Sequence, residues 1–116
     1  MNQHVRIKRV YEPYDSKDNK RILIDRLWPR GLSKDKAHID LWLKDIAPSA
    51  ELRKWFGHDP AKWPEFQKRY RIELDANGTA VNELQKQLKD GPATLVYGAK
   101  DEKHNDAVVL KDYLEK

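Results

Sequence analysis

The chain of 116 residues is short enough to form a single domain over residues 1–116 and long enough to bury one core, and its four Trp and five Tyr residues argue against disorder. It contains no cysteine, which excludes disulfides, thiolate catalysis and cysteine-ligated zinc. The net charge of +4 permits binding of nucleic acid or anions, but 23 Lys and Arg residues interleaved with 19 Asp and Glu residues are equally typical of a mixed solvated surface.

The sequence shows no membrane-spanning or targeting segment. It has no run of about 18 apolar residues, so we expect no transmembrane helix and no membrane partner. The first ten residues carry charges where a signal peptide needs an apolar stretch. We therefore expect a cytoplasmic protein.

The first half of the chain predicts two strands and one ambiguous segment. Residues 5–11 alternate apolar and basic side chains, as a strand does, and residues 12–20 have the composition of a loop. The nearly continuous apolar run of "RILID", residues 21–25, indicates a central strand covered on both faces. Residues 37–46 fit helical spacing and strand alternation equally well, and we prefer the helix.

The second half predicts several helices and a third strand. Ser49 can cap a short helix that Gly57 closes, and Asp59-Pro60 signals the start of another, with Pro64 delaying or kinking its first turn. Residues 77 and 78, Asn-Gly, separate that helix from the next. Residues 93–99 form an apolar strand, and a last helix follows, capped by Asn105 or Asp101.

This order of elements predicts the α/β class, as a small open sheet with a parallel, Rossmann-like core and helices packed on its faces. Two buried strands joined by a helical crossover are expected to run parallel. In open parallel sheets, ligands bind outside the carboxyl ends of the strands. A site is therefore expected where residues 21–25 and 93–99 end.

Charged residues follow both of these strands. Asp25, Arg26 and Arg30 follow the first strand, and the second is followed by Lys100, Asp101, His104 and Asn105. The three cations could hold an anion beside the N-terminus of the last helix, because arginine and helix N-termini both favour negatively charged groups.

Within the same cluster, His104 is the candidate acid or base, oriented by Asp25 or Asp101. The alternative is that these charges form salt bridges that fix a tight loop, with Trp28 as packed core.

No motif indicates a metal or a cofactor. The histidines lack HxH and HExxH spacing, and the chain has no Walker loop, no G-x-G-x-x-G and no G-x-S-x-G. His58, in "GHDP", is better explained as a loop or capping residue than as a ligand. We therefore expect no metal site and no cofactor.

Long segments resemble a known family. "RVYEP", "RILIDRLWPRG", "WLKDIAPSAELRKWFGHDPAKWPEF", "RYRIEL" and "LVYGAKDEKHNDAVVLKDYL" are similar to the YeaO-like proteins of domain of unknown function 488, over essentially the whole chain. The resemblance implies a compact α/β domain with a Rossmann-like core. Longer relatives place a helix between the first two strands, where this chain has only a loop, so the direction of the first strand stays open.

The resemblance also implies a set of polar positions. Some longer relatives carry a Cys-His-Arg segment after the last strand, where this chain has His104-Asn105-Asp106, so thiol chemistry cannot be carried over. The family's polar motif positions correspond here to Asp25, Arg26, Arg30, Lys44, Asp45, Ser49, His58, Lys100, Asp101, His104 and Asn105. The resemblance adds Lys44, Asp45 and Ser49 to the residues found from the strand ends.

Three hypotheses about function follow. The first is a binding or processing site for a small anionic ligand, phosphate- or nucleotide-like, at the carboxyl edge of the sheet. The second is a nucleic-acid-binding module, which the absence of a helix-turn-helix or aromatic strand motif disfavours. The third is a non-catalytic interaction or regulatory protein. Enzymatic activity and oligomeric state stay open.

Overall fold

The computed structural model describes residues 5–115, so the first four residues of the N-terminal stretch lie outside the described part. Four strands form one sheet: β1 (Arg6–Arg9), β2 (Lys20–Leu23), β3 (Leu41–Trp42) and β4 (Ala93–Tyr97). Their order is β1-β4-β2-β3 and every pair is parallel. The predicted α/β class and parallel core are confirmed, and the first strand, whose direction the sequence left open, runs parallel to β4.

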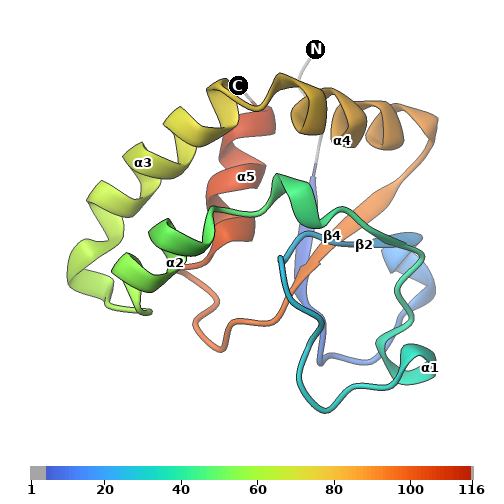
Figure 1. Cartoon of the computed structure of the whole chain (residues 1–116). Helices are drawn as coiled ribbons and strands as arrows, with labels where there is room; N and C mark the ends of the chain where they lie inside the picture. Colours follow the sequence, from blue (N-terminus) through green and yellow to red (C-terminus); the bar gives the residue numbers. More distant parts are fainter. Residues whose placement is uncertain (1–4, 116) are drawn as a thin grey trace.

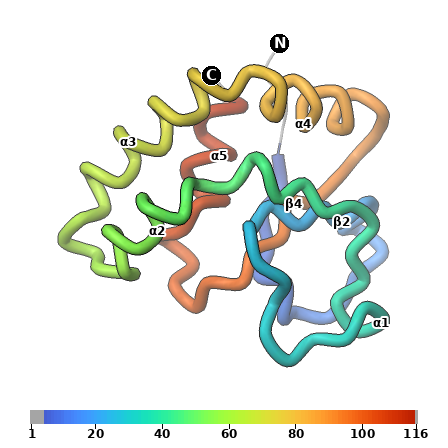
Figure 2. Tube along the Cα trace, viewed as in Figure 1, coloured from blue at the N-terminus to red at the C-terminus, as the bar shows by residue number. Residues whose placement is uncertain are grey.

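The two faces of the sheet are covered differently. Side chains alternate between faces along a strand. Ile22 and Leu95 point into the larger apolar core, beneath the helices α2 (Ala50–Phe56), α3 (Trp63–Asp75), α4 (Gly78–Asp90) and α5 (Asp106–Glu115). Leu23 and Val96 point to the other face, into a smaller cluster with Ala37 of α1 (Lys34–Ala37). Figures 1 and 2 show α1 on the opposite side of the strands from α2, α3 and α5.

The predicted caps position the helices that follow β3. Ser49 Oγ accepts a hydrogen bond from Leu52 N, and Gly57 ends α2 with a left-handed φ of 53°. Asp59 caps the short 3₁₀ helix η3 (Pro60–Lys62), and α3 begins directly after it. Asn105 Oδ1 accepts a hydrogen bond of 3.0 Å from Val108 N in the first turn of α5. These starts and stops are the ones that the sequence predicted.

The preference for a helix over residues 37–46 was wrong. Helix α1 ends at Ala37, and His38 takes a left-handed φ of 48° that a helix cannot continue. The chain then pairs with the edge of β2 as the two-residue strand β3, extended by the hydrogen bond from Leu43 N to Leu23 O at 2.9 Å. A 3₁₀ turn, η2 (Lys44–Ile46), follows. Pairing with the open edge of β2 overrides the local preference, since an unpaired backbone beside a strand gains hydrogen bonds there.

A charge cluster is buried on the second face of the sheet. The guanidinium of Arg21 is buried and donates to Val10 O at 2.9 Å, and it lies 3.5 Å from the carboxylate of Asp18. Lys8 Nζ lies 3.0 Å from the same carboxylate. Burial alone would raise the pKa of Asp18, but the hydrogen bond from Lys8, with that from Asp15 N and the charges of Lys8 and Arg21, brings it below its ordinary value.

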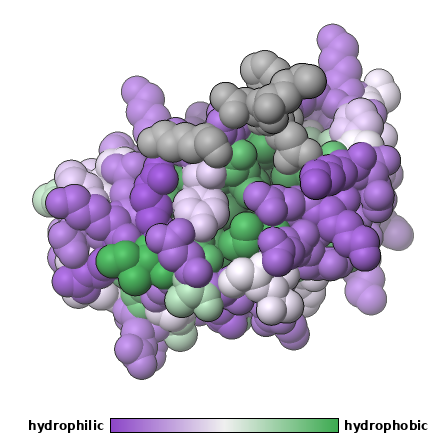
Figure 3. Space-filling view, turned by 90° about the horizontal axis from the view of Figure 1, so that it is seen from above, coloured by the Kyte–Doolittle hydropathy of each residue, from purple (hydrophilic) through white to green (hydrophobic). Residues whose placement is uncertain are grey.

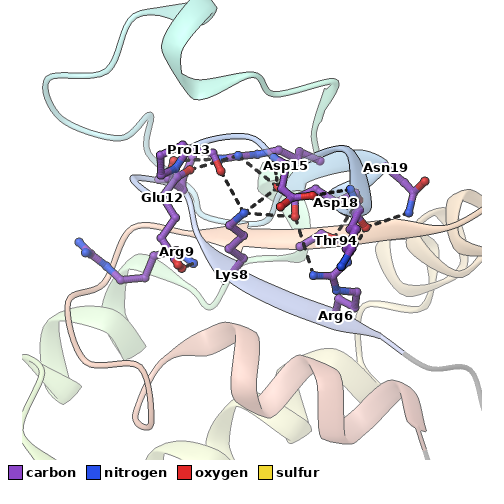
Figure 4. Close-up of polar contacts among 12 residues, drawn as sticks. Arg6, Lys8, Arg9, Glu12, Pro13, Asp15, Asp18, Asn19 and Thr94 are labelled. Carbon is purple, nitrogen blue, oxygen red and sulfur yellow. Dashed lines mark hydrogen bonds and ion pairs between the residues drawn. The ribbon is translucent and has the colours of Figure 1, made fainter.

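This cluster holds the loop that replaces a helix between β1 and β2. Figure 4 shows Lys8 and Asp18 pointing toward one another on the side of the sheet away from α5, with Thr94 of β4 alongside. Thr94 Oγ1 donates to Asp18 O at 2.9 Å, and Asp15 caps η1 (Ser16–Asp18). Residues 10–19 are therefore anchored to the strands by polar contacts rather than by a packed helix.

The helices carry a largely hydrophilic outer surface. In the view of Figure 3, hydrophilic side chains cover most of the face, with hydrophobic ones gathered near its centre and at one side. Among residues 5–115, no helix has the length and apolar character that crossing a bilayer requires.

Candidate functional site

A cavity of about 610 Å³ opens at the carboxyl edge of the sheet. Its walls come mainly from residues 25–30 after β2, residues 98–99 and 104–106 after β4, and helix α2 with the turn that follows it. Because β2 and β4 are parallel neighbours, the segments after them leave the sheet on the same side. The two charged segments predicted to meet therefore line one cavity, with Asp25 and His104 both among the lining residues.

The loop after β2 is held by two tryptophans. Trp42 Nε1 donates to Asp25 O at 2.7 Å, and Trp28 Nε1 donates to Leu32 O at 2.8 Å. The two rings meet edge to face with centroids 5.6 Å apart. Trp28 also packs against the smaller apolar cluster, so it stiffens the loop while bordering the cavity.

A pair of carboxyl groups, Asp25 and Asp106, lies in the inner part of the cavity. Asp25 Oδ2 accepts a hydrogen bond of 2.8 Å from Gly98 N, and the side chains of Asp25 and Asp106 hydrogen-bond to one another. Two carboxyl groups can do so only when they share a proton. A Cβ at Gly98 would lie 3.2 Å from Asp25 Oδ2, so a glycine at this position lets the chain pass close to the carboxyl group.

Burial and mutual repulsion raise the pKa of both carboxyl groups. For Asp25, burial raises the pKa, while the hydrogen bond with Asp106 and the one from Gly98 N oppose it. For Asp106, burial is again the largest cause, and the charge of Asp25 adds to it, so its pKa lies well above the ordinary value. Folding therefore favours the protonated form of Asp106, and to a smaller extent that of Asp25.

His104 and Asp101 form a second pair at the same edge. His104 Nδ1 lies 2.8 Å from Asp101 Oδ2, and the edge of the ring meets Trp63 with centroids 5.2 Å apart. The hydrogen bond with the imidazole, with those from Lys103 N and His104 N, lowers the pKa of Asp101. Of the two predicted orienting acids, Asp101 is the one that contacts the imidazole. This leaves Nε2 as the ring nitrogen that a ligand could contact.

Four cationic side chains line the cavity: Arg26, Arg30, Arg53 and Lys54. Arg26 donates to the carbonyls of Ala47 and Pro48 at 3.4 Å. Arg53 Nε is buried without a hydrogen-bond partner among the described residues. Arg30 and Lys54 are exposed, and within residues 5–115 their side chains make no hydrogen bond or ion pair. Because Arg30 and Lys54 are the exposed ones, we call the part of the cavity that they line its mouth.

Several predicted residues have other positions or other roles. Lys100 does not line the cavity, and Lys44 lies over the ring of Trp42, 5.3 Å from its centroid. Ser49 caps α2 and borders a separate cavity of about 190 Å³, where its hydroxyl donates to Glu73 Oε2 at 2.7 Å. Asn105 lines the larger cavity, but its side chain is engaged in capping α5. Asp101 contacts His104 and does not itself line the cavity.

His58 reaches the cavity because the chain turns sharply after α2. Gly57 and His58 both adopt left-handed backbone conformations, with φ of 53° and 57°. The ring of His58 lies 6.2 Å from that of Phe56, and both residues line the cavity. No group of three or more His, Asp or Glu side chains among residues 5–115 is arranged to hold a metal ion.

Comparison with known proteins assigns the chain to a family. Residues 4–116 match the description "Inactive DUF488-N3 subclade". The chain belongs to this subclade of the DUF488 family. It is 41% identical to "Uncharacterized protein YeaO" of Escherichia coli K12 over 111 residues, which cover 96% of each chain. It is also 41% identical to "Uncharacterized protein Rv3073c" of Mycobacterium tuberculosis H37Rv over 110 residues, covering 95% of this chain and 92% of the relative. No solved structure matches it significantly.

Three residues of this DUF488-N3 site were not singled out from the sequence. Arg53 and Lys54 were interpreted only as part of the helix "AELRKWF", although with Ala50 they lie on the side of that helix that lines the cavity. Asp106 follows the capping Asn105 directly. A carboxyl group in the first turn of a helix is common and stabilising, so nothing in the sequence distinguished it from an ordinary helix start. Only the parallel pairing of β2 with β4 brings it to Asp25.

Proposed function

We propose that the cavity at the carboxyl edge of the sheet binds a small anionic ligand, phosphate- or nucleotide-like. The observation that carries the proposal is the gathering of four cationic side chains around one cavity, two of which make no polar side-chain contact within residues 5–115. Guanidinium groups suit the planar, two-pronged oxygens of phosphate and carboxylate. Arg30 and Lys54 at the mouth hold the anion, with Arg53 behind them.

Binding without turnover fits this chain better than catalysis. The subclade to which it belongs is described as inactive. The Asp101–His104 pair has the arrangement of an oriented imidazole, and in a binding protein His104 Nε2 serves as a hydrogen-bonding group to the ligand. The roles are therefore anion binding for the arginines and Lys54, and ligand orientation for His104.

The experiment is a calorimetric and thermal-shift titration with inorganic phosphate, pyrophosphate and nucleoside monophosphates. A ligand that binds the native state increases the free energy of unfolding, by about 2.7 kcal/mol at a hundredfold excess over its Kd. The melting temperature rises as a result. Replacing Arg30 by Met or Lys54 by Met removes one charge-assisted contact each, so we expect each change to weaken binding about tenfold. Both side chains are exposed, so folding should be unaffected.

Lys100→Met is the matched control. It removes the same kind of charge from an exposed position in the loop after β4 that does not line the cavity. This variant should bind as tightly as the unmodified chain. The proposal fails if none of the anions binds, or if Lys100→Met weakens binding as much as Arg30→Met, since the effect would then be general charge attraction.

A further inference from the structure

The carboxyl pair Asp25 and Asp106 restricts which part of a ligand can lie beside it, in addition to the anion that the cations bind. Asp25 and Asp106 both line the cavity, and among residues 5–115 neither forms a salt bridge, although the charges of Arg53 and His58 lie close enough to lower the pKa of Asp25. Either carboxyl group, when ionised, repels a phosphate that lies close to it. An anion therefore belongs at the mouth, and a different group belongs beside the carboxyl pair.

The pair presents both hydrogen-bond donors and acceptors. Gly98 N occupies one lone pair of Asp25, and the shared proton joins Asp25 to Asp106. Each carboxyl oxygen has two lone pairs, so acceptor capacity remains on both groups. When the shared proton turns toward a ligand, the pair also becomes a donor. Such a surface is complementary to a group that carries N–H donors, with or without a neighbouring nitrogen acceptor.

Aromatic side chains also line the cavity. Phe56 and Phe66 stack on one another with ring centroids 4.3 Å apart and are almost fully buried, whereas Tyr11 is 39% exposed and Trp28 is half-buried. The accessible rings of Tyr11 and Trp28 offer stacking surface, which favours a planar, conjugated group over a compact ammonium ion. A volume of about 610 Å³ is within the range of cavities that hold small ligands with two such parts.

We propose that the ligand is bipolar: a planar nitrogen group with N–H donors contacts Asp25 and Asp106, and a phosphate or carboxylate lies at the mouth between Arg30 and Lys54. This inference rests on the proposed anion binding and narrows it to one ligand class. Two sources supply this chemistry, namely nucleotides, through an amidine-type base edge, and amino acids with a guanidinium group. The two are distinguished by which of them binds more tightly.

The decisive comparison uses two ligands that differ in one amino group. Adenosine monophosphate carries an exocyclic amine, and purine riboside monophosphate lacks it while keeping the same ring and phosphate. Calorimetry at pH 7 should show the amine-bearing ligand binding about tenfold more tightly, as one buried hydrogen-bonding group left unpaired is worth about 1.4 kcal/mol. Inorganic phosphate should bind more weakly than either. Binding of L-arginine, measured in the same way, tests the alternative that the ligand is an amino acid with a guanidinium group.

Asp106→Ala tests whether the carboxyl group of Asp106 contacts the nitrogen group of the ligand. It should reduce the tenfold preference to about one and leave the affinity for inorganic phosphate unchanged. Asp35→Ala, which removes an exposed carboxyl group on α1, should keep the preference. The ligand pair also tests the inference in the unmodified chain if Asp106→Ala folds poorly.

The outcomes separate the two proposals. The bipolar inference fails if neither adenosine monophosphate nor arginine binds more tightly than phosphate, or if Asp106→Ala keeps the full preference, even where phosphate binding itself stands. Absence of binding by every anion contradicts the proposed function instead, and the inference with it. Tighter binding of arginine than of adenosine monophosphate, lost in Asp106→Ala, supports the bipolar site with an amino-acid ligand.

Discussion

At the scale of single residues, Asp106 occupies a position that serves two purposes. The N-terminus of a helix stabilises a nearby negative charge, and Asp106 is the first residue of α5. Its neighbour Asp25 and its burial oppose that charge, and they raise its pKa well above the ordinary value. An acidic residue at this position therefore suits the start of the helix, but ionisation of its carboxyl group near neutral pH lowers the stability of the fold.

The sign of this effect gives a prediction for Asp106→Asn. Because the pKa in the folded chain is raised above the unfolded value near 3.8, the folded state binds more protons than the unfolded state between the two values. Stability therefore falls as pH rises through that window. We expect Asp106→Asn to lack this fall and to melt at a higher temperature than the unmodified chain at pH 7, with the difference shrinking toward pH 4.

Thermal unfolding between pH 4 and pH 8 measures the difference. Asp35→Asn, which changes an exposed carboxyl group outside the cavity, should keep the pH profile of the unmodified chain. If Asp106→Asn showed the same pH dependence as the unmodified chain, the carboxyl pair would not retain a proton in the folded state.

At the scale of elements, the connection of α2 to α3 depends on one serine. Ser49 Oγ accepts from Leu52 N at 3.1 Å and donates to Glu73 Oε2 at 2.7 Å, and Ser49 N donates to Glu73 Oε1 at 2.8 Å. The N-cap of α2 is therefore tied to the last turn of α3. Since α2 carries Arg53 and Lys54, this contact sets the wall of the cavity without lining it.

Ser49→Ala should lower the free energy of unfolding by about 2 kcal/mol. It removes a helix cap, usually worth about 1 kcal/mol, and a hydrogen bond to a carboxylate of similar value. Urea denaturation measures the loss. Ser33→Ala is the control, because the Ser33 hydroxyl caps the four-residue helix α1 at the surface and has no second partner among the described residues. A loss in Ser49→Ala no greater than that in Ser33→Ala would mean that the contact with Glu73 contributes nothing.

The elements also show what the sequence can predict. Caps at Ser49, Asp59 and Asn105 and the turn at Gly57 were predicted because each is a local hydrogen bond or a local backbone conformation. Residues 37–46 fitted strand alternation as well as helical spacing, and the choice of the helix was wrong because the hydrogen bonds that decide it go to β2, some 20 residues away. The same limit applied to Asp106, whose importance depends on a contact with a residue 81 positions earlier.

The part of the site that depends on sheet topology alone could be predicted from the sequence. Parallel pairing of two apolar strands predicted that Asp25 and His104 would line one cavity, and both do. It did not separate residues that face the cavity from those beside it, such as Lys100, since the rotation of a loop residue is set by contacts that the sequence does not display. Whether these residues bind a ligand stays a prediction.

At the scale of the whole molecule, the two faces of the sheet have different chemistry. One face is an apolar core beneath four helices, and the cavity opens at its carboxyl edge. The other face combines a small apolar cluster with the buried charges of Asp18, Arg21 and Lys8. In a chain with no packed helix between β1 and β2, these charges do what an apolar helix face does in longer α/β proteins: they attach the connection to the sheet.

Asp18→Asn should therefore destabilise the whole fold rather than one loop. It leaves the buried guanidinium of Arg21 without its counter-charge, and breaking a buried pair from one side costs about 3 kcal/mol. The pKa of Asp18 is lowered in the folded chain, so its contribution is present above the unfolded value near 3.8 and is lost as pH falls through the folded value. In urea denaturation, the difference between Asp18→Asn and the unmodified chain should be full at pH 7 and smaller at pH 3.

Lys8→Met, which removes a partly exposed partner, should cost less. A loss below about 0.5 kcal/mol in Asp18→Asn, the size of an ordinary surface substitution, would show that the loop is held by its backbone hydrogen bonds alone.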